Sequence, residues 1–235
     1  MIRVSMCKIC DREFIPTRMI TLTEGHITYK IRGCESCGAW ELIEPKPKTL
    51  DWYTSGDYRK EVPRTSEAVR VARAGDAMVC TLLQKKIGYK RFIVLDVCAE
   101  DESVREWRLL GEDSIYRTHG IRMGGVHNPL SYTDLESVPK RTHDIITCLV
   151  SFEHMEDPVQ FLGELVRLVK NGGRVMASVP YIRHEPEGLT GKGVLKPHHT
   201  WYFNRKAFIE LMSRHTDLEM WVHNGETQWA IGRVA

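Results

Sequence analysis

Along the second half of the chain, short apolar runs alternate with stretches whose apolar residues recur at helical spacing. Residues 144–150 are mostly apolar and rich in β-branched side chains, which is typical of a strand buried on both faces. Pro158 suits the first turn of a helix, and apolar residues recur at helical spacing up to Val169. We expect Asn171-Gly172-Gly173 to close this helix, because glycine adopts the left-handed cap at little cost. Residues 174–179 then predict a second buried strand, and the order strand, helix, strand indicates a parallel α/β sheet.

The same patterns recur on both sides of this stretch. The helices predicted from spacing are 65–87, 103–110 and one that begins after Asn204. The strands predicted from apolar runs are 91–97, 114–119, 218–223 and 228–234. Asn224-Gly225 lies between the last two strands and is typical of a tight hairpin turn. The predicted fold class is therefore α/β, with a mostly parallel sheet, an antiparallel last strand and helices on both faces.

A different pattern marks residues 1 to about 42. Apolar and polar residues alternate over 19–23 and 26–32, on either side of Glu24-Gly25, which predicts a β-hairpin. Two Cys-x-x-Cys pairs flank this hairpin: Cys7 with Cys10, and Cys34 with Cys37. Each pair suits a tight turn, and four thiolates complete a tetrahedral shell around Zn²⁺. A redox pair or free thiols are the alternative, but two pairs at this spacing favour zinc.

This first region is typical of a zinc ribbon. It has too little core to fold alone, so metal binding would supply the missing free energy, of order 10 kcal/mol in isolated zinc modules. Four protein ligands leave no open position, so we expect a structural zinc. Ribbons often contact partners, and nucleic acid and protein are both candidates. We therefore predict a zinc ribbon over 1–42, a linker with an aromatic segment over 43–63, and the α/β domain over 64–235.

Composition and charge add limits. The chain has 235 residues, 42% of them hydrophobic and 27% charged, with a net charge of +2, which is ordinary for a soluble globular protein. No apolar run approaches the ~20 residues that span a bilayer, and the N-terminus lacks the apolar core of a signal peptide, so we expect no membrane partner. The seven cysteines are an odd number, and without a secretion signal they favour the reducing cytoplasm over a disulfide framework.

Several motifs resemble the second half of a class I S-adenosylmethionine (SAM)-dependent methyltransferase. They are Asp144-Ile145-Ile146, Phe152-Glu153-His154, Asp157-Pro158, Gly172-Gly173, Val179-Pro180 and the segment from His198 to Phe203. The likeness extends from about Ile87 to the C-terminus. It implies a Rossmann-like methyltransferase sheet, SAM as the cofactor and methyl transfer as the reaction.

The loop after the first strand of this sheet departs from the family pattern Asp-x-Gly-x-Gly. Asp96 matches, but Cys98 and Glu100 occupy the glycine positions and Glu102 follows. Glycine lets such a loop approach the ligand and take a positive φ, which costs other residues roughly 1 kcal/mol or more. The acids would also repel the carboxylate of SAM, by about 1 kcal/mol at ~4 Å in water and about 4 kcal/mol in a partly buried site. This departure predicts weakened or lost SAM binding unless the loop turns the glutamates outward.

The resemblance implies further cofactor contacts. The family ends its second strand with an acid that binds the ribose, whereas His119 and Gly120 stand there in this chain. Asp134 matches a family position that meets the adenine amine, although a simple turn acid explains it equally well. The aromatic residues of 51–58 either cover the cofactor cleft or pack the ribbon against the main domain. The cofactor-binding residues that the resemblance implies are Asp96, Cys98, Glu100, Asp134, Leu135 and Val150.

The candidate catalytic residues are Glu153, His154, His198 and His199. Ligands of open parallel sheets bind at the carboxyl ends of the strands, and a histidine there has a pKa suited to a general base. The alternatives are that Glu153 and His154 only tie their turn together and that His198 and His199 only hydrogen-bond the long loop before them. Some quinone O-methyltransferases of this class bind a metal through an extra Glu three residues before the Glu-His pair. That position is Val150 here, so the sequence gives no reason to infer a metal at this pair.

Two functions follow from these observations. The first is methyl transfer from SAM to an oxygen, nitrogen or carbon nucleophile of a small metabolite, a sugar or a nucleic acid. The second is a catalytically inactive methyltransferase-like scaffold that binds protein or nucleic acid through its zinc ribbon. The altered loop and the missing ribose acid favour the scaffold, and the retained Glu-His and His-His motifs favour the enzyme. We prefer the methyltransferase interpretation, with the acceptor unidentified.

Overall fold

The computed structural model describes residues 6–12, 19–24, 27–46, 66–88, 91–98, 115–119, 131–132, 135–182 and 195–235. The chain groups into two compact units. The first contains Met1–Lys48, Val150–Gly163 and Ser178–Gly232, and the second contains Thr49–Leu149, Glu164–Ala177 and Arg233–Ala235. The predicted helix over 103–110 and the aromatic segment 51–58 lie outside the described residues, and the predicted domain boundaries stay a prediction.

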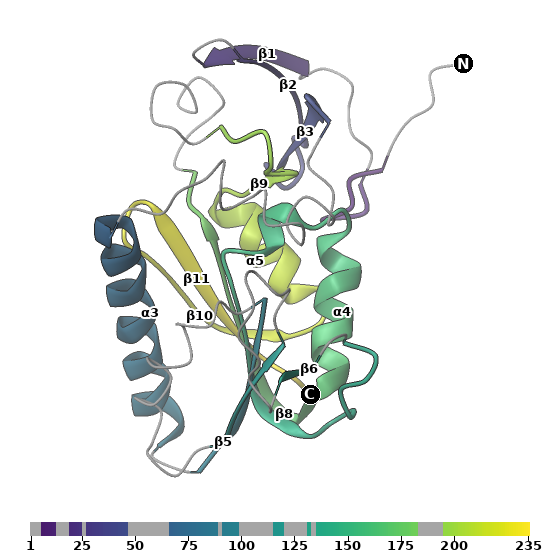
Figure 1. Cartoon of the computed structure of the whole chain (residues 1–235). Helices are drawn as coiled ribbons and strands as arrows, with labels where there is room; N and C mark the ends of the chain where they lie inside the picture. Colours follow the sequence, from purple (N-terminus) through teal and green to yellow (C-terminus); the bar gives the residue numbers. More distant parts are fainter. Residues whose placement is uncertain are drawn as a thin grey trace. The chain divides into compact units, whose positions relative to one another are not determined.

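The first unit contains a four-stranded antiparallel sheet. Its strands are β1 (Met19–Glu24), β2 (Ile27–Gly33), β3 (Trp40–Glu44) and β9 (Trp201–Tyr202), in the order β1-β2-β3-β9 (Figure 1). Glu24 pairs with Ile27 at the end of the β1–β2 hairpin, which confirms the predicted hairpin. The two-residue strand β9 comes from far along the chain and pairs Tyr202 with Trp40, so the sheet extends beyond residues 1–42.

The core of this sheet also draws on distant residues. Its buried side chains are Tyr29, Ile31, Trp40, Leu42, Ile182, Leu195 and Tyr202. Burying a large apolar side chain stabilises a fold by about 1.5–3 kcal/mol. Three of the seven come from beyond residue 180, so the hairpin gains part of its core from residues far outside the predicted ribbon.

The rest of the first unit follows the predicted pattern. The helix α5 (Arg205–Ser213) begins after Asn204, whose Oδ1 accepts a hydrogen bond from the Ala207 N–H at 2.8 Å, as expected of an N-cap. The strands β10 (Asp217–His223) and β11 (Thr227–Arg233) are neighbours, and β11 also neighbours β8 (Val169–Pro180). Asn224 Oδ1 accepts hydrogen bonds from the N–H groups of Glu226 and Thr227, which fixes the predicted turn.

The second unit contains the parallel part of the larger sheet. Its strands have the order β8-β7-β4-β5-β6, where β7 is His143–Leu149, β4 is Ile93–Val97, β5 is Ile115–His119 and β6 is Ser131–Tyr132. β4 pairs in parallel with both β5 and β7, and β5 pairs in parallel with β6. The helix α3 (Ser66–Ile87) precedes this sheet, and α4 (Pro158–Leu168) begins in the first unit and ends in the second. The parallel α/β sheet is confirmed.

The Asn171-Gly172-Gly173 segment corrects one prediction. It does not close α4, which ends at Leu168, but lies within β8. Gly172 does take a positive φ of 76°, yet its N–H donates to the Val234 carbonyl at 2.8 Å, and the Val234 N–H donates to the Gly173 carbonyl at 2.9 Å. A Cβ at Gly173 would lie 2.7 Å from the Asp144 carbonyl oxygen. The glycines therefore serve close backbone packing in the sheet, a requirement that local spacing does not reveal.

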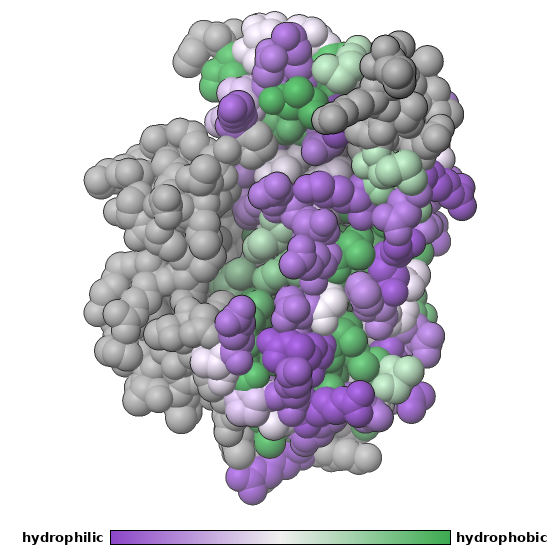
Figure 2. All heavy atoms as spheres, turned by 90° about the vertical axis from the view of Figure 1, so that its right-hand side faces the viewer, coloured by the Kyte–Doolittle hydropathy of each residue, from purple (hydrophilic) through white to green (hydrophobic). Residues whose placement is uncertain are grey.

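The surface of the described residues carries few large apolar side chains. Those exposed are Met6, Met19, Met78 and Val150. On the face shown in Figure 2, hydrophilic residues predominate and hydrophobic residues are scattered among them. Within the described part of the chain, no helix has the length and apolar character needed to cross a membrane.

Candidate functional site

The two Cys-x-x-Cys pairs form turns of the same design. The Cys7 N–H donates to the Arg12 carbonyl and the Cys34 N–H to the Ala39 carbonyl, both at 2.8 Å. In return, Asp11 and Gly38 donate to the carbonyls of Cys7 and Cys34, at 2.9 and 2.7 Å. Asp11 and Gly38 both have a positive φ, of 54° and 76°. Each turn therefore closes on its first cysteine and brings both thiols of the pair to one side.

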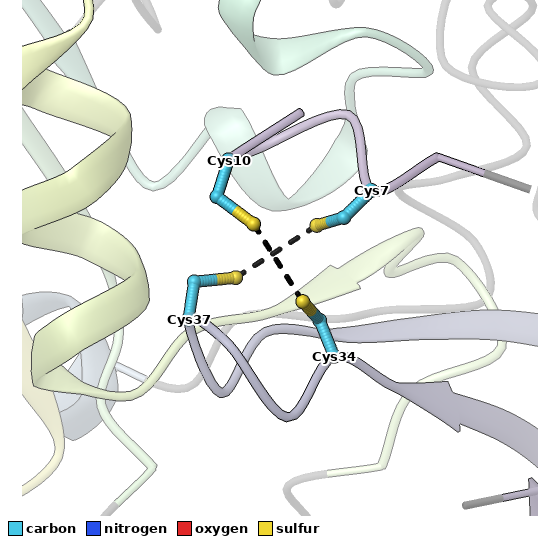
Figure 3. A group of neighbouring side chains, drawn as sticks. All are labelled: Cys7, Cys10, Cys34 and Cys37. Atoms are coloured by element: carbon cyan, nitrogen blue, oxygen red, sulfur yellow. Dashed lines mark hydrogen bonds between the residues drawn. The ribbon is translucent and has the colours of Figure 1, made fainter. Parts of the chain in front are cut away.

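The four cysteine sulfurs converge on one point (Figure 3). Cys7 Sγ lies 3.7 Å from Cys37 Sγ, and Cys10 Sγ lies 3.6 Å from Cys34 Sγ. All four lie within 4.8 Å of one another, and all four residues are buried. Four sulfurs bound to a tetrahedral Zn²⁺ at ~2.3 Å would be separated by about 3.8 Å, whereas a disulfide requires ~2.05 Å. The donor set, spacing and burial fit a zinc ion with four thiolate ligands.

The thiols of this cluster are hydrogen-bonded to one another in pairs. The hydrogen bond from Cys37 lowers the pKa of the Cys7 thiol to about 6, and the same bond raises the pKa of Cys37. Burial raises the pKa of Cys10 to about 11. Four buried sulfurs cannot all carry a charge without a cation among them, which agrees with the fit to zinc.

Side chains of the first unit hold both turns in place. Asn204, the cap of α5, packs so closely on the second turn that a Cβ at Gly38 would lie 2.2 Å from Asn204 Nδ2. Asp11 of the first turn forms an ion pair with Arg214. Lys8 donates to the Glu156 carbonyl at 3.1 Å. Residues more than 140 positions away in sequence thus support the cysteine cluster.

A second buried cluster in the first unit contains Glu153, His154, His198 and His199. Glu153 and His154 lie in the short 3-10 helix η3 (Phe152–His154) that follows β7. The Thr200 N–H donates to the Glu153 carbonyl at 2.7 Å, which joins η3 to the segment that carries His198 and His199. The imidazole centroids are 4.8 to 5.6 Å apart. The structure therefore brings together all four predicted catalytic residues.

Burial sets the charge of this cluster. Glu153 is 1% exposed, and the exposed fractions of His198 and His199 are 6% and 8%. Burial lowers the pKa of His154 to about 4, and the hydrogen bond to the His198 carbonyl only partly opposes this. Burial also lowers the pKa of His199, with the nearby His154 and His198 acting in the same direction. His154 and His199 are therefore neutral near pH 7 and present lone pairs rather than positive charge.

The residues predicted to bind the cofactor are only partly described. Asp96 is 4% exposed and accepts a hydrogen bond from Thr147 Oγ1 at 2.6 Å. Cys98 follows β4 with a φ of 59°. The backbone is therefore in the left-handed conformation at a position where the family pattern has glycine. Leu135 accepts a hydrogen bond through its carbonyl from Arg167 at 3.0 Å. Glu100 and Asp134 lie outside the described residues.

Val150 is a strained position in the first unit. Its φ is 49°, which is rare for a β-branched residue, and its side chain is 38% exposed. Its N–H donates to both the carbonyl and the Oγ of Ser178, at 2.9 and 3.1 Å. Backbone strain of this kind clusters at functional sites. Sequence reasoning named Val150 but missed Ser178 and Thr147, because nothing local marks either residue as a partner.

Comparisons with known proteins agree with this architecture. The profile of a family described as a methyltransferase domain matches residues 74–222, more than half of the chain. A Burkholderia thailandensis 1,6-didemethyltoxoflavin-N1-methyltransferase is similar in structure, with a TM-score of 0.57 and 14% identity over 91% of this chain and 100% of that one. Magnesium protoporphyrin IX methyltransferase from Synechocystis PCC 6803 has a TM-score of 0.52 and 12% identity over 79% of this chain and 94% of that one. No curated protein matches the sequence. At these identities the solved structures establish the fold alone.

Proposed function

Because the chain belongs to the family of methyltransferase domains, we propose that it transfers the methyl group of SAM to a nucleophilic acceptor. SAM supplies an electrophilic methyl group, so the protein has two tasks. It must position the acceptor in line with that group, and it must deal with the proton that the acceptor loses. Candidate acceptors are a small metabolite, a sugar or a nucleic acid.

The observation that carries this proposal is the buried cluster of Glu153, His154, His198 and His199. A fold alone needs no such cluster, because burying several polar side chains costs free energy unless they find partners. In open α/β sheets, ligands bind beyond the carboxyl ends of the strands, and Glu153 and His154 follow the end of β7. Neutral imidazoles there have a lone pair that can accept a hydrogen bond from the nucleophilic group of an acceptor.

Cofactor binding is supported by residues at the end of β4. Asp96 is buried and oriented by Thr147, as expected of a carboxylate that must hold one direction to bind a ligand. Cys98 keeps a left-handed backbone despite the cost of roughly 1 kcal/mol or more for a residue with a Cβ. These two features favour a ligand-binding end of β4 that keeps its backbone conformation at Cys98, where the family pattern has glycine.

For the four cysteines, the proposal is one structural zinc ion bound by Cys7, Cys10, Cys34 and Cys37. Four protein thiolates leave no free coordination position, so this ion would stabilise the fold rather than take part in the reaction. A nucleic acid or protein partner for the ribbon stays a prediction.

Calorimetry with SAM on the zinc-loaded protein tests the proposed reaction. We expect measurable binding that Asp96→Asn weakens at least tenfold, while Asp217→Asn, at an exposed position of β10, leaves it unchanged. No detectable heat at millimolar SAM would contradict the proposed methyl transfer and favour the catalytically inactive scaffold. Glu100→Gly should tighten binding, because it removes an acid near the carboxylate of SAM. An unchanged affinity would contradict the argument about the loop.

A further inference from the structure

We propose that Glu153, His154 and His199 bind a divalent metal ion of the first transition row, at a site separate from the four cysteines. Each residue offers one ligand atom, and these atoms lie within 4.8 Å of one another. Glu153 and His199 are buried and His154 is partly buried. Two imidazole nitrogens and one carboxylate oxygen are a donor set that zinc and its neighbours in the transition row accept.

The orientation of His154 is the first argument. Its Nδ1 lies 2.9 Å from the His198 carbonyl oxygen. A carbonyl oxygen only accepts hydrogen bonds, so Nδ1 carries the proton and Nε2 carries a lone pair. Metal-binding histidines are typically oriented in this way, with one nitrogen donating to a carbonyl or carboxylate and the other binding the ion. The His198 backbone thus prepares Nε2 of His154 as a ligand.

The distance between Nε2 of His154 and Glu153 is the second argument. Nε2 lies 3.8 Å from Glu153 Oε1, which is too long for a hydrogen bond. Two ligand atoms bound to one tetrahedral zinc ion at ~2.0–2.1 Å would be separated by about 3.4 Å. The pair is therefore close to the spacing of two atoms that share an ion, and it is not spaced for direct contact with each other.

His199 supplies the third argument. Its side chain is 8% exposed, and among the described residues its Nδ1 has no hydrogen-bond partner. Leaving a buried polar atom unpartnered costs about 1–3 kcal/mol. The His199 ring lies 4.9 Å from that of His154 in an edge-to-face arrangement. A metal ion bound by His199 would also balance the charge of the buried Glu153 carboxylate.

No local motif reveals this site, because Val150 stands where some quinone O-methyltransferases have the third metal ligand. The structure instead places His199 beside the Glu153-His154 pair, from a segment more than 40 residues further along the chain. Three protein ligands leave a coordination position open, as in catalytic zinc sites. The role of this open position rests on the proposed methyl transfer. It would bind the oxygen of a hydroxyl-bearing acceptor and lower the pKa of that hydroxyl.

Metal analysis without SAM tests the site separately from the proposed reaction. The full chain is loaded with Zn²⁺, freed of excess ion, and its bound zinc is measured. We expect two zinc ions per chain in the wild type and one in Glu153→Gln and in His199→Ala. His215→Ala, a change at an exposed histidine of the same unit, should keep two. A wild type that binds one ion, or a second ion that survives both substitutions, would overturn the proposal.

Cobalt(II) provides a second measurement on the same variants. The four-cysteine site should show thiolate-to-cobalt charge-transfer absorption, whereas the second equivalent should add only the weaker bands of a nitrogen and oxygen site. Glu153→Gln and His199→Ala should remove only the bands of the second equivalent. Glu153→Gln keeps the shape of the side chain, so it remains informative if His199→Ala does not fold. Retained thiolate absorption shows that the first unit is folded, and a second equivalent unaffected in Glu153→Gln would contradict the assignment.

Discussion

The cysteine cluster and the histidine cluster, which consists of Glu153, His154 and His199, differ in how the chain supplies their donor atoms. Both are buried groups of the first unit whose donor atoms lie within 4.8 Å of one another. The cysteines come from two short turns of one design, each closed by its own backbone hydrogen bonds. The Glu153-His154 pair and His199 are joined by hydrogen bonds between segments that are distant in sequence. The turns of the first site are encoded locally, although distant side chains support them, and the second site depends on the completed fold.

The largest effect is expected from Cys34→Ser. It removes one of four proposed zinc ligands, so the chain should lose the ribbon zinc and the first unit should unfold at much lower denaturant concentration. Metal binding contributes of order 10 kcal/mol in isolated zinc modules, although the distant core of the sheet will reduce the loss here. Zinc content and urea unfolding measure the effect.

The matched control for that change is Cys80→Ala, at a buried cysteine of α3 outside the cluster. It should keep the ribbon zinc, because the change removes one small buried side chain outside the cluster. A Cys34→Ser protein that keeps its ribbon zinc would refute the four-cysteine assignment.

Tyr202→Ala should have the next largest effect and should separate the two clusters. Tyr202 is 2% exposed and belongs to β9, so we expect a loss of about 3–5 kcal/mol in the free energy of unfolding. Its hydroxyl donates to the Lys196 carbonyl at 3.0 Å, and the His199 N–H donates to that same carbonyl at 3.1 Å. The histidine cluster should therefore lose metal affinity before the cysteine cluster does.

Tyr202→Phe refines this test, since it removes the hydroxyl and keeps the ring. Losing that hydrogen bond should cost about 1 kcal/mol, seen in urea unfolding. If both Tyr202 variants weaken the two metal sites equally, the proposed independence of the two clusters is wrong.

A smaller effect than that of Tyr202→Ala is expected from Gly38→Ala, which acts on the second cysteine turn. Alanine at this position would have to keep a positive φ, and its Cβ would lie 2.2 Å from Asn204 Nδ2. We therefore expect a loss of about 1–3 kcal/mol in the free energy of unfolding. Asn204→Ala alone should cost about 1 kcal/mol as a lost helix cap. The double variant should cost less than the sum of the two, because Asn204→Ala removes the clash. Strict additivity in urea unfolding would contradict the contact.

The local features of this protein were predictable from its sequence. The hairpin of β1 and β2, the helix cap at Asn204 and the turn of each Cys-x-x-Cys pair depend on residues close together in sequence. Spacing, turn residues and alternation report such features directly. The order strand, helix, strand also predicted the parallel sheet, which the structure confirms. The family profile confirms the resemblance to methyltransferases.

The features that sequence did not predict are contacts between distant segments. Nothing in the two residues Trp201 and Tyr202 marks them as a strand that pairs with β3. The Gly172-Gly173 pair looked like a helix cap because its packing against Asp144 and Val234 is not visible locally. Motifs identified Glu153, His154 and His199 as candidates, but only the structure shows that their ligand atoms lie within 4.8 Å of one another.

The late strand β9 has a consequence for synthesis on the ribosome. β3 ends at Glu44 and its partner strand begins at Trp201, so the edge of β3 waits for roughly 160 further residues. At 5–20 residues per second this delay is about 8–32 s. During it the nascent hairpin presents an uncovered strand edge, which is prone to pair with other chains. We expect ribosome-bound chains to gain protease resistance over residues 19–44 only once residue 202 has left the tunnel, and protection in chains that stop well before it would contradict this order.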